Sequence, residues 1–156
     1  MKADETFKRL DPLVFQALQL ANRMEVATDI FTAASSGNVV FDRYWPSGYA
    51  YGVADGLDGD YLINLHRWLP QPDLFILIDS TVEVLRDRRP EARDRYERNA
   101  GHLKEVAANY RALWRKMAHE GDSRRWVIID SYGTKEETAT HINAAVAHAR
   151  EARHGE

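Results

Sequence analysis

Three short apolar runs, each followed by an aspartate, constrain the fold more than any other feature of the sequence. The runs occupy residues 39–41, 74–78 and 126–129, and the aspartates are Asp42, Asp79 and Asp130. Continuous apolar runs of this length are typical of strands buried on both faces of a parallel sheet. Segments with helical periodicity lie between them, and strands that alternate with helices form parallel sheets with right-handed crossovers. The sequence therefore predicts an α/β fold in three layers, with helices on both faces of a parallel sheet, in a single domain of residues 1–156.

The first predicted helix begins at Asp11 and Pro12, where the aspartate caps free amides and the proline suits the first helical position. Apolar residues then recur at steps of three and four, which predicts one buried stripe; they are Leu13, Ala17, Leu20, Met24, Ala27, Phe31 and Ala34. Gly37 ends the helix. A polar row of Gln16, Gln19 and Arg23 runs beside the stripe, and it is either a solvated helix face or part of a site.

The remaining predicted elements follow from caps and breakers. Ser47 caps a short helix through Tyr51, residues 53–60 form a loop, and residues 61–69 form a helix that prolines close. Residues 80–83 and 134–137 both have the spacing of a capping box, which opens a helix. Between them lies a long helix whose predicted stripe is Leu103, Val106, Tyr110, Leu113 and Met117. The last helix runs to about Ala149, and residues 150–156 are expected to fray.

Composition excludes several classes of function. The chain has no cysteine, which rules out disulfides, thiolate metal sites and a cysteine nucleophile, and is compatible with a reducing compartment. A formal net charge of -3 argues against a general nucleic-acid binder, which needs a basic surface. No apolar run approaches the roughly 20 residues of a membrane span, and the polar start lacks the profile of a signal peptide. The sequence predicts a cytoplasmic protein that binds neither nucleic acid nor membranes.

Asp42 and Arg43 stand at the predicted carboxyl end of the first apolar run. Ligands of open α/β sheets bind beyond the carboxyl ends of the strands. Arginine offers a planar fork to phosphate oxygens, and aspartate can hold a metal-bound water. The pair is therefore placed for a ligand that carries phosphate and magnesium. The alternative is that Asp42 caps a turn and Arg43 is a surface charge.

A concentrated arginine segment follows the second run. Six arginines and no lysine lie within thirteen residues: Arg86, Arg88, Arg89, Arg93, Arg95 and Arg98. Arginines that close over a transferred phosphoryl group stabilise its transition state more than its ground state. Acidic residues are interleaved with them, so an ion-paired surface helix is the alternative. We expect a phosphate-closing segment that faces the same cavity as Asp42 and Arg43.

Five motifs in order give the chain a resemblance to a known family. They are Ala-Asn-Arg-Met-Glu at 21–25, Asp-Arg-Tyr at 42–44, Ser-Gly-Tyr-Ala-Tyr at 47–51, Pro-Asp-Leu at 72–74 and Asp-Arg-Tyr-Glu at 94–97. With these motifs the chain resembles the thymidylate kinases from about Leu10 to Ala149. The resemblance implies a P-loop-kinase-like fold and transfer of the ATP γ-phosphate to dTMP with Mg²⁺.

The resemblance also implies roles for individual residues. Arg43 would bind the acceptor phosphate, and Asp42 would lie near the magnesium and hold it through water. Arg23 would bond the pyrimidine, Ser47 would begin the pocket, and Tyr51 would press on the sugar and favour deoxynucleotides. In the arginine segment, Arg88, Arg93 and Arg95 would contact phosphates and Tyr96 would line the nucleoside pocket.

Two positions of the base pocket depart from the family pattern. Gln19 stands where the family commonly stacks a phenylalanine on the thymine, so base affinity or base choice differs from the pattern. Gly48 stands where some members carry an asparagine that touches the base, although others have glycine.

The sequence contains no G-x-x-x-x-G-K-[ST] motif, whose backbone amides and lysine hold the donor phosphates. Its lysines are Lys2, Lys8, Lys104, Lys116 and Lys135, and none follows a glycine-rich loop. The family's N-terminal strands and P-loop are therefore missing from the match. Without the strand that lies between the first two runs, we expect either a compacted three-stranded sheet or exposed edges that pair with another chain.

Three functions remain open at this point. The first is a thymidylate kinase whose P-loop half is encoded upstream or supplied by a separate chain, with a homodimer through the first helix as the family's usual assembly. The second is a non-catalytic nucleotide-binding or interaction module that retains the acceptor pocket alone. The third is an unstable fragment without an independent role. The isolated chain is expected to be a poor kinase, because phosphoryl transfer relies on the positioning and charge neutralisation that the P-loop supplies.

Overall fold

The computed structural model describes residues 10–81, 84, 100–120 and 125–154. These residues fall into two compact units, Met1–Gln71 and Pro72–Glu156, which are described separately here. Organisation as one domain stays a prediction. No helix in the described ranges combines the length and the apolar character that a membrane span requires.

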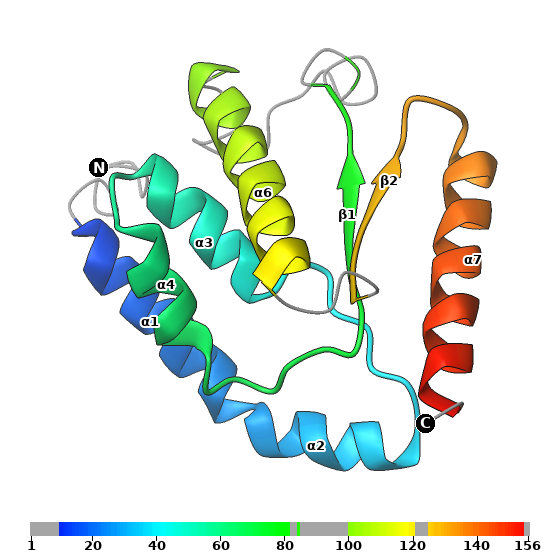
Figure 1. The fold of residues 1–156 in the computed structure, drawn as a ribbon. Coiled ribbons are helices and arrows are strands. Elements are labelled where there is room, and N and C mark those ends of the chain that lie inside the picture. The colour runs from blue at the N-terminus through cyan, green and yellow to red at the C-terminus, as the bar shows by residue number, and fades with distance from the viewer. Residues whose placement is uncertain (1–9, 82–83, 85–99, 121–124, 155–156) are drawn as a thin grey trace, which may run out of the picture. The chain divides into compact units, whose positions relative to one another are not determined.

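The first unit is helical. Its elements are α1 (Pro12–Glu25), α2 (Ala27–Ser36), α3 (Trp45–Ala54) and α4 (Gly59–His66), all labelled in Figure 1. The predicted start of α1 is confirmed, because the Asp11 side chain accepts a 2.8 Å hydrogen bond from the Leu13 amide. The single long helix that we predicted is divided at Val26, and Gly37 ends α2 as expected.

Helix α1 directs inward the polar row that runs beside the stripe, and not the stripe that the periodicity predicted. The only buried residue of α1 is the polar Gln16, and α2 has none. Within the predicted stripe, Met24 is 50% exposed and Phe31 is 63% exposed, and Leu13 is exposed as well. The predicted buried stripe is therefore wrong, and the polar row is the side of α1 that packs against α3.

The first predicted strand is also wrong. Residues 38–41 adopt neither helix nor strand, and the side chain of Val40 is 91% exposed. A strand forms only where its amides and carbonyls find a ladder partner. The described residues of this unit contain helices alone, so the apolar run has no strand to pair with inside the unit.

Helix α3 packs closely against both of its neighbours because two glycines face them. A Cβ on Gly48 would lie 2.9 Å from Gln16 Oε1 of α1, and a Cβ on Gly52 would lie 2.7 Å from Leu62 Cδ1 of α4. Ser47 lies inside the first turn and does not cap the helix, since Tyr44 is the N-cap residue and offers no side-chain bond. The predicted loop at 53–60 is shortened because α3 continues to Ala54 and α4 starts at Gly59, where Asp58 caps it.

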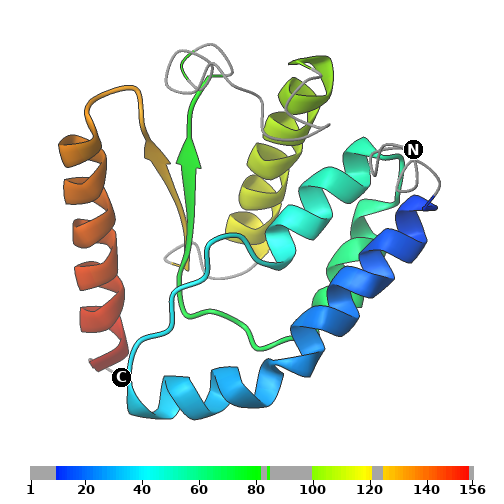
Figure 2. The same ribbon diagram turned by 180° about the vertical axis from the view of Figure 1, so that it is seen from behind.

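The second unit contains a parallel sheet and two long helices. Its strands are β1 (Phe75–Asp79) and β2 (Trp126–Asp130), paired in parallel with Asp79 beside Asp130. Helices α6 (Ala100–Glu120) and α7 (Lys135–His154) both contact β2, and both views show the strands between them (Figures 1 and 2). The α/β class with a parallel sheet is confirmed. The sheet of the described residues has two strands rather than three.

An aromatic cluster joins α6 to the sheet. The rings of Phe75 and Trp126 stack with centroids 3.9 Å apart, and Trp114 of α6 meets Trp126 edge-on at 4.9 Å. The Trp114 indole also donates a 3.0 Å hydrogen bond to the Val127 carbonyl. Successive side chains of a strand alternate between faces, so buried Ile129 lies on the face opposite Trp126. Strand β2 thus has a buried side chain on each face.

The predicted capping box at 134–137 is confirmed, whereas the one predicted at 80–83 includes residues outside the described ranges. The Thr134 hydroxyl accepts a hydrogen bond from the Glu137 amide at 3.1 Å, and Glu137 Oε2 accepts one from the Thr134 amide at 2.7 Å. This reciprocal pair is the predicted capping box. We expected the chain to fray from residue 150. Helix α7 continues to His154, so this expectation is wrong for residues 150–154.

Candidate functional site

Arg43 has the most unusual backbone of the described residues. Its φ of 61° makes it the only described non-glycine residue with a positive φ. A side chain in this left-handed region costs roughly 1–2 kcal/mol, and such strain clusters at functional sites. The Arg43 guanidinium lies 5.7 Å from the centroid of the Tyr51 ring, and Nη1 donates a 3.3 Å hydrogen bond to the Tyr51 hydroxyl. Two residues that the sequence assigned to one pocket are therefore in contact.

Arg23 of α1 reaches the start of α3. Its Nη2 donates a long 3.4 Å hydrogen bond to the Tyr44 carbonyl. Burial raises the pKa of the Tyr44 phenol, and the nearby Arg23 charge opposes that shift. The Tyr44 ring stacks on Phe41 with centroids 4.5 Å apart. Arg23 thus lies beside the residue that follows Arg43 in the chain.

The other predicted pocket residues of this unit lie on the facing helices α1 and α3. Gln19 is half-buried on α1, Ser47 and Tyr51 are half-buried on α3, and Gly48 is buried between them. Asp42 is exposed next to Arg43. The structure therefore gathers one acid, two arginines and a tyrosine near the start of α3. The sequence did not predict the strained backbone of Arg43.

Arg88, Arg93, Arg95 and Tyr96 lie outside the described residues. Our expectation that the arginine segment faces the same cavity as Asp42 and Arg43 stays a prediction.

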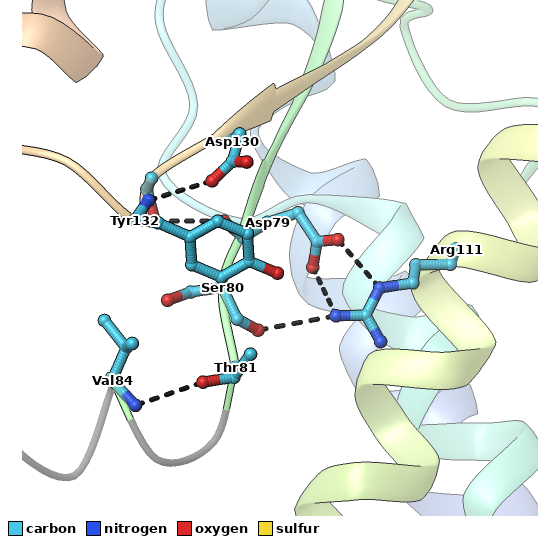
Figure 3. Close-up of polar contacts among 8 residues, drawn as sticks. Asp79, Ser80, Thr81, Val84, Arg111, Asp130 and Tyr132 are labelled. Carbon is cyan, nitrogen blue, oxygen red and sulfur yellow. Dashed lines mark hydrogen bonds and ion pairs between the residues drawn. The ribbon is translucent and has the colours of Figure 1, made fainter.

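A second polar cluster lies at the carboxyl ends of the two strands (Figure 3). Arg111 of α6 donates hydrogen bonds to both oxygens of the Asp79 carboxylate, from Nε at 2.8 Å and from Nη2 at 2.7 Å. The Asp79 bond raises the pKa of Arg111 further above its usual value. A bidentate pair of this kind fixes both partners in orientation. It anchors α6 to the end of β1.

Residues that follow each strand complete this cluster. Ser131 donates to the Asp79 carbonyl from its amide and from its hydroxyl, both at 3.0 Å, and the Tyr132 amide donates to the Asp130 carboxylate at 2.9 Å. Ser80 Oγ is buried and has no hydrogen-bond partner among the described residues. Figure 3 draws Tyr132 together with Asp79, Ser80 and Arg111, and Tyr132 is among the groups that raise the pKa of Arg111. The sequence located the two aspartates but gave no signal for Arg111, which lies 32 positions from its partner.

The described residues contain no group of three or more histidine, aspartate or glutamate side chains that could hold a metal ion. Mg²⁺ is often bound by only one or two carboxylates, together with waters and substrate phosphates. Asp42, which is exposed beside Arg43, fits that limited role.

Comparison with known proteins assigns the family. The family model described as thymidylate kinase matches residues 3–142. The chain is 29% identical over 145 residues to a thymidylate kinase of Schizosaccharomyces pombe, an alignment that covers 90% of this chain and 68% of that protein. It is 33% identical over 124 residues to a thymidylate kinase of Brachyspira hyodysenteriae, and that alignment covers 76% of this chain and 61% of the relative. It is also 33% identical over 90 residues to a thymidylate kinase of Dictyostelium discoideum, and that alignment covers 57% of this chain and 40% of the relative.

The chain thus spans between 40% and 68% of the length of these three relatives. The family model, in contrast, matches well over half of this chain. The motifs at 21–25, 42–44 and 47–51, on which the resemblance depended, fall inside that match. The chain therefore belongs to the thymidylate kinase family.

Proposed function

We propose that this chain carries the acceptor site of a thymidylate kinase, an enzyme that transfers the γ-phosphate of ATP to dTMP and produces dTDP and ADP. The reaction takes place in the cytoplasm and supplies the synthesis of dTTP. Family membership, together with the arrangement around Arg43, supports this proposal.

The observation that carries the proposal is the strained, outward-facing Arg43 held against Tyr51. Its guanidinium is exposed, and a guanidinium is a planar fork that can grip an acceptor phosphate in two parallel bonds. Each such charge-assisted contact is worth about 1.5–3 kcal/mol. Tyr51, fixed in place by Arg43, lines the sugar next to that phosphate.

The base and the donor side involve the remaining predicted residues. Arg23 bonds the pyrimidine, while Gln19, Ser47 and Gly48 line its surroundings and Tyr96 closes the nucleoside pocket. ATP supplies the phosphoryl group and Mg²⁺ neutralises charge on its phosphates when it is bound. Asp42 would hold Mg²⁺ through water, and three residues of the arginine segment would neutralise charge on the transferred group; these are Arg88, Arg93 and Arg95.

Donor binding needs a P-loop, which we propose comes from another chain or from a further segment of a longer protein. Within its unit, β1 pairs with β2 along one edge, and the described residues offer no strand for the other edge. Ile78 of β1 is 51% exposed, although its apolar run suits a strand covered on both faces. A parallel strand that leads into a P-loop would pair with this edge and cover that surface.

A homodimer through α1 and α2 is the second partner that we propose. The outer apolar face of these helices consists of exposed large apolar residues: Leu13, Val14, Leu18, Met24, Val26 and Phe31. Exposed apolar residues that gather in a patch mark interaction sites. A helical face can pack against the same face of a second copy about a two-fold axis. In such an interface both subunits use the same set of residues.

A non-catalytic nucleotide-binding module is the alternative function. The observation that favours it is the absence of G-x-x-x-x-G-K-[ST] from the sequence. This module would keep the dTMP site around Arg43 and lack the donor site.

One experiment separates these functions. Binding of dTMP to the chain is measured by calorimetry, and ADP production from ATP is measured with dTMP, dUMP or dCMP, for the chain alone and for a version extended upstream with a P-loop. The Arg43→Met variant is expected to weaken dTMP binding by about one to two decades, since each decade corresponds to about 1.4 kcal/mol. Lys104→Met, a surface substitution in α6, serves as the charge-matched control.

The kinase proposal predicts dTMP-dependent ADP release from the extended version, lowered by Arg43→Met and unaffected by Lys104→Met. Binding of dTMP without ADP release in either version supports the non-catalytic module. An absence of dTMP binding in both versions contradicts both functions.

A further inference from the structure

Two buried polar side chains in the first unit have atoms without hydrogen-bond partners. Gln16 and His66 are each 1% exposed, and neither Gln16 Oε1 nor His66 Nε2 has a partner in the described part of the chain. An unsatisfied buried polar group destabilises the folded state, because it has lost its hydrogen bonds to water without a replacement. Such groups are rare in native structures, and each one calls for an explanation.

The two atoms converge on one point of α3. A Cβ added to Gly48 would lie 2.9 Å from Gln16 Oε1 and 3.1 Å from His66 Nε2. Gln16 belongs to α1 and His66 to the last turn of α4, so two helices approach the bare backbone of Gly48 from different sides. One turn later, a Cβ on Gly52 would be 3.4 Å from Gln16 Nε2. The Gln16 amide therefore lies along the glycine face of α3.

The hydrogen bonds of His66 fix its protonation. Nδ1 lies 2.8 Å from the Leu62 carbonyl oxygen, which can only accept, so Nδ1 carries the proton. Nε2 of the neutral ring is then an acceptor. Burial lowers the pKa of His66, the Leu62 bond opposes that shift, and the Arg23 charge adds to it. The Trp45 ring stacks on the imidazole with centroids 6.2 Å apart, which holds the ring in place.

We propose that Gln16 and His66 are positioning residues of the nucleotide site: by closing on Gly48 from α1 and α4, they fix the first turn of α3 and so set where Tyr51 meets Arg43. This inference rests on the proposed function. Ser47 and Tyr51 flank Gly48 in the same helix, and the Tyr51 hydroxyl accepts the Arg43 hydrogen bond at 3.3 Å. A shift of α3 at Gly48 would therefore move both the sugar contact and the phosphate contact.

The arrangement also explains why position 48 has no side chain. A methyl group there would meet Gln16 Oε1 at a distance that real Cβ contacts essentially never show, so either α3 or the Gln16 amide must move. On this proposal the two unsatisfied acceptors, Gln16 Oε1 and His66 Nε2, persist beside Gly48 because their close approach fixes the position of α3. The folded state is less stable as a result, but the site residues on α3 are held in place, which is common at functional sites.

A compensating pair of substitutions tests this inference. Gly48→Ala introduces the collision, and Gln16→Ala removes Gln16 Oε1, the atom nearest to the new methyl group, while the 3.1 Å contact with His66 remains. The dTMP dissociation constant is measured by calorimetry at a temperature where every variant is folded, so that a change in stability alone does not alter it. Gly37→Ala is the control, because a Cβ at Gly37 meets nothing within 4 Å.

Gly48→Ala is expected to raise the dissociation constant on the order of tenfold, because small misplacements of positioning groups carry large costs. Addition of Gln16→Ala is expected to restore it to within about threefold of the parent, and Gly37→Ala to leave it unchanged. Parent-like binding by Gly48→Ala, or a double variant as weak as the single one, would overturn the proposal. If Gly48→Ala does not fold, Gln16→Ala alone decides: weaker dTMP binding supports positioning, and unchanged binding overturns it.

Amide chemical shifts of Ser47 and Tyr51 separate this inference from the proposed function. Gly48→Ala is expected to displace both shifts, and Gln16→Ala to return them. If the parent chain binds no dTMP, the proposed function fails, and these shifts alone judge the placement of α3. Shifts that stay at their parental values in Gly48→Ala would overturn the placement.

Discussion

Helices α1 and α6 carry similar apolar stripes in sequence, yet they use them in opposite ways. In α6, Val106 and Leu113 of the predicted stripe are buried, and Trp114 packs on the sheet. In α1, Gln16 is buried while Leu13 and Met24 are exposed. The stripe of α6 has a sheet to cover, whereas the neighbour of α1 is the glycine face of α3, which accepts a flat amide. Periodicity tells which residues share a face; the neighbouring element decides which face turns inward.

The largest expected effect comes from a comparison of a buried leucine of α6 with an exposed leucine of α1. Leu113 is completely buried in α6, so Leu113→Ala should lower the unfolding free energy by about 2–5 kcal/mol. Leu18 of α1 is 55% exposed, so Leu18→Ala should change it by less than about 0.5 kcal/mol in the monomer. Urea denaturation at low protein concentration measures both. Equal losses for the two variants would contradict the comparison.

A somewhat smaller effect tests what covers the outer apolar face. Phe31→Asp should weaken the proposed homodimer by about 2 kcal/mol or more, because it places a charge in an apolar interface. Sedimentation velocity over a range of concentrations reports the change as a shift to the monomer. Trp68→Asp, which changes a similarly exposed aromatic residue in the turn that follows α4, is the control. Dimers that survive Phe31→Asp, or a parent chain that stays monomeric, would exclude this interface.

The pair between β1 and α6 allows a comparison within the second unit. Asp79 and Arg111 are partly buried and bidentate, so a double-mutant cycle with Asp79→Asn and Arg111→Met should give a coupling of about 1–2 kcal/mol. The single 3.5 Å contact between Lys116 and the exposed Glu120, one turn apart on α6, should give only about 0.3–0.5 kcal/mol. Thermal or urea denaturation supplies both cycles. Indistinguishable couplings would mean that the strand-end pair behaves as a surface pair.

The smallest effect concerns pH and the buried histidine of the first unit. Burial lowers the pKa of His66, so the unfolded chain takes up the proton near pH 6.5 while the folded chain resists it to lower pH. The contribution of His66 to stability is therefore present above about pH 6.5 and is lost as the pH falls below it. His66→Asn, which keeps a donor near the position of Nδ1, should flatten the slope of unfolding free energy between pH 7 and pH 5. Parallel slopes in the two proteins would refute this.

Local signals in the sequence predicted the local parts of the fold. Asp11 with Pro12, and Thr134 with Glu137, mark helix starts because each cap is made within three residues. The strands at 75–79 and 126–130 were predicted from their apolar runs, and each has the other as its ladder partner within one unit. Residues 39–41 have the same composition, but a strand also needs a partner, and the run itself carries no information about one.

The candidate site was predictable as a set of residues but not in its geometry. Family motifs pointed to Arg23, Arg43 and Tyr51, and the structure brings Arg43 against Tyr51. The positive φ of Arg43, the burial of Gln16 and the bond from Arg111 to Asp79 all depend on contacts between distant segments. Periodicity and capping patterns describe neighbours in sequence, so they could not reveal these contacts.

The most direct test of the account uses the absence of cysteine from the chain, which allows single thiols to be introduced at neighbouring positions of α1. Gln19 lies on the inward polar row and Leu18 on the outer apolar face, so modification rates of the Gln19→Cys and Leu18→Cys variants are compared with and without dTMP, at a concentration where the chain is monomeric. The account predicts that the thiol at position 18 reacts faster and ignores dTMP, while dTMP slows modification at position 19. A faster reaction at position 19, or equal protection of both thiols by dTMP, would contradict it.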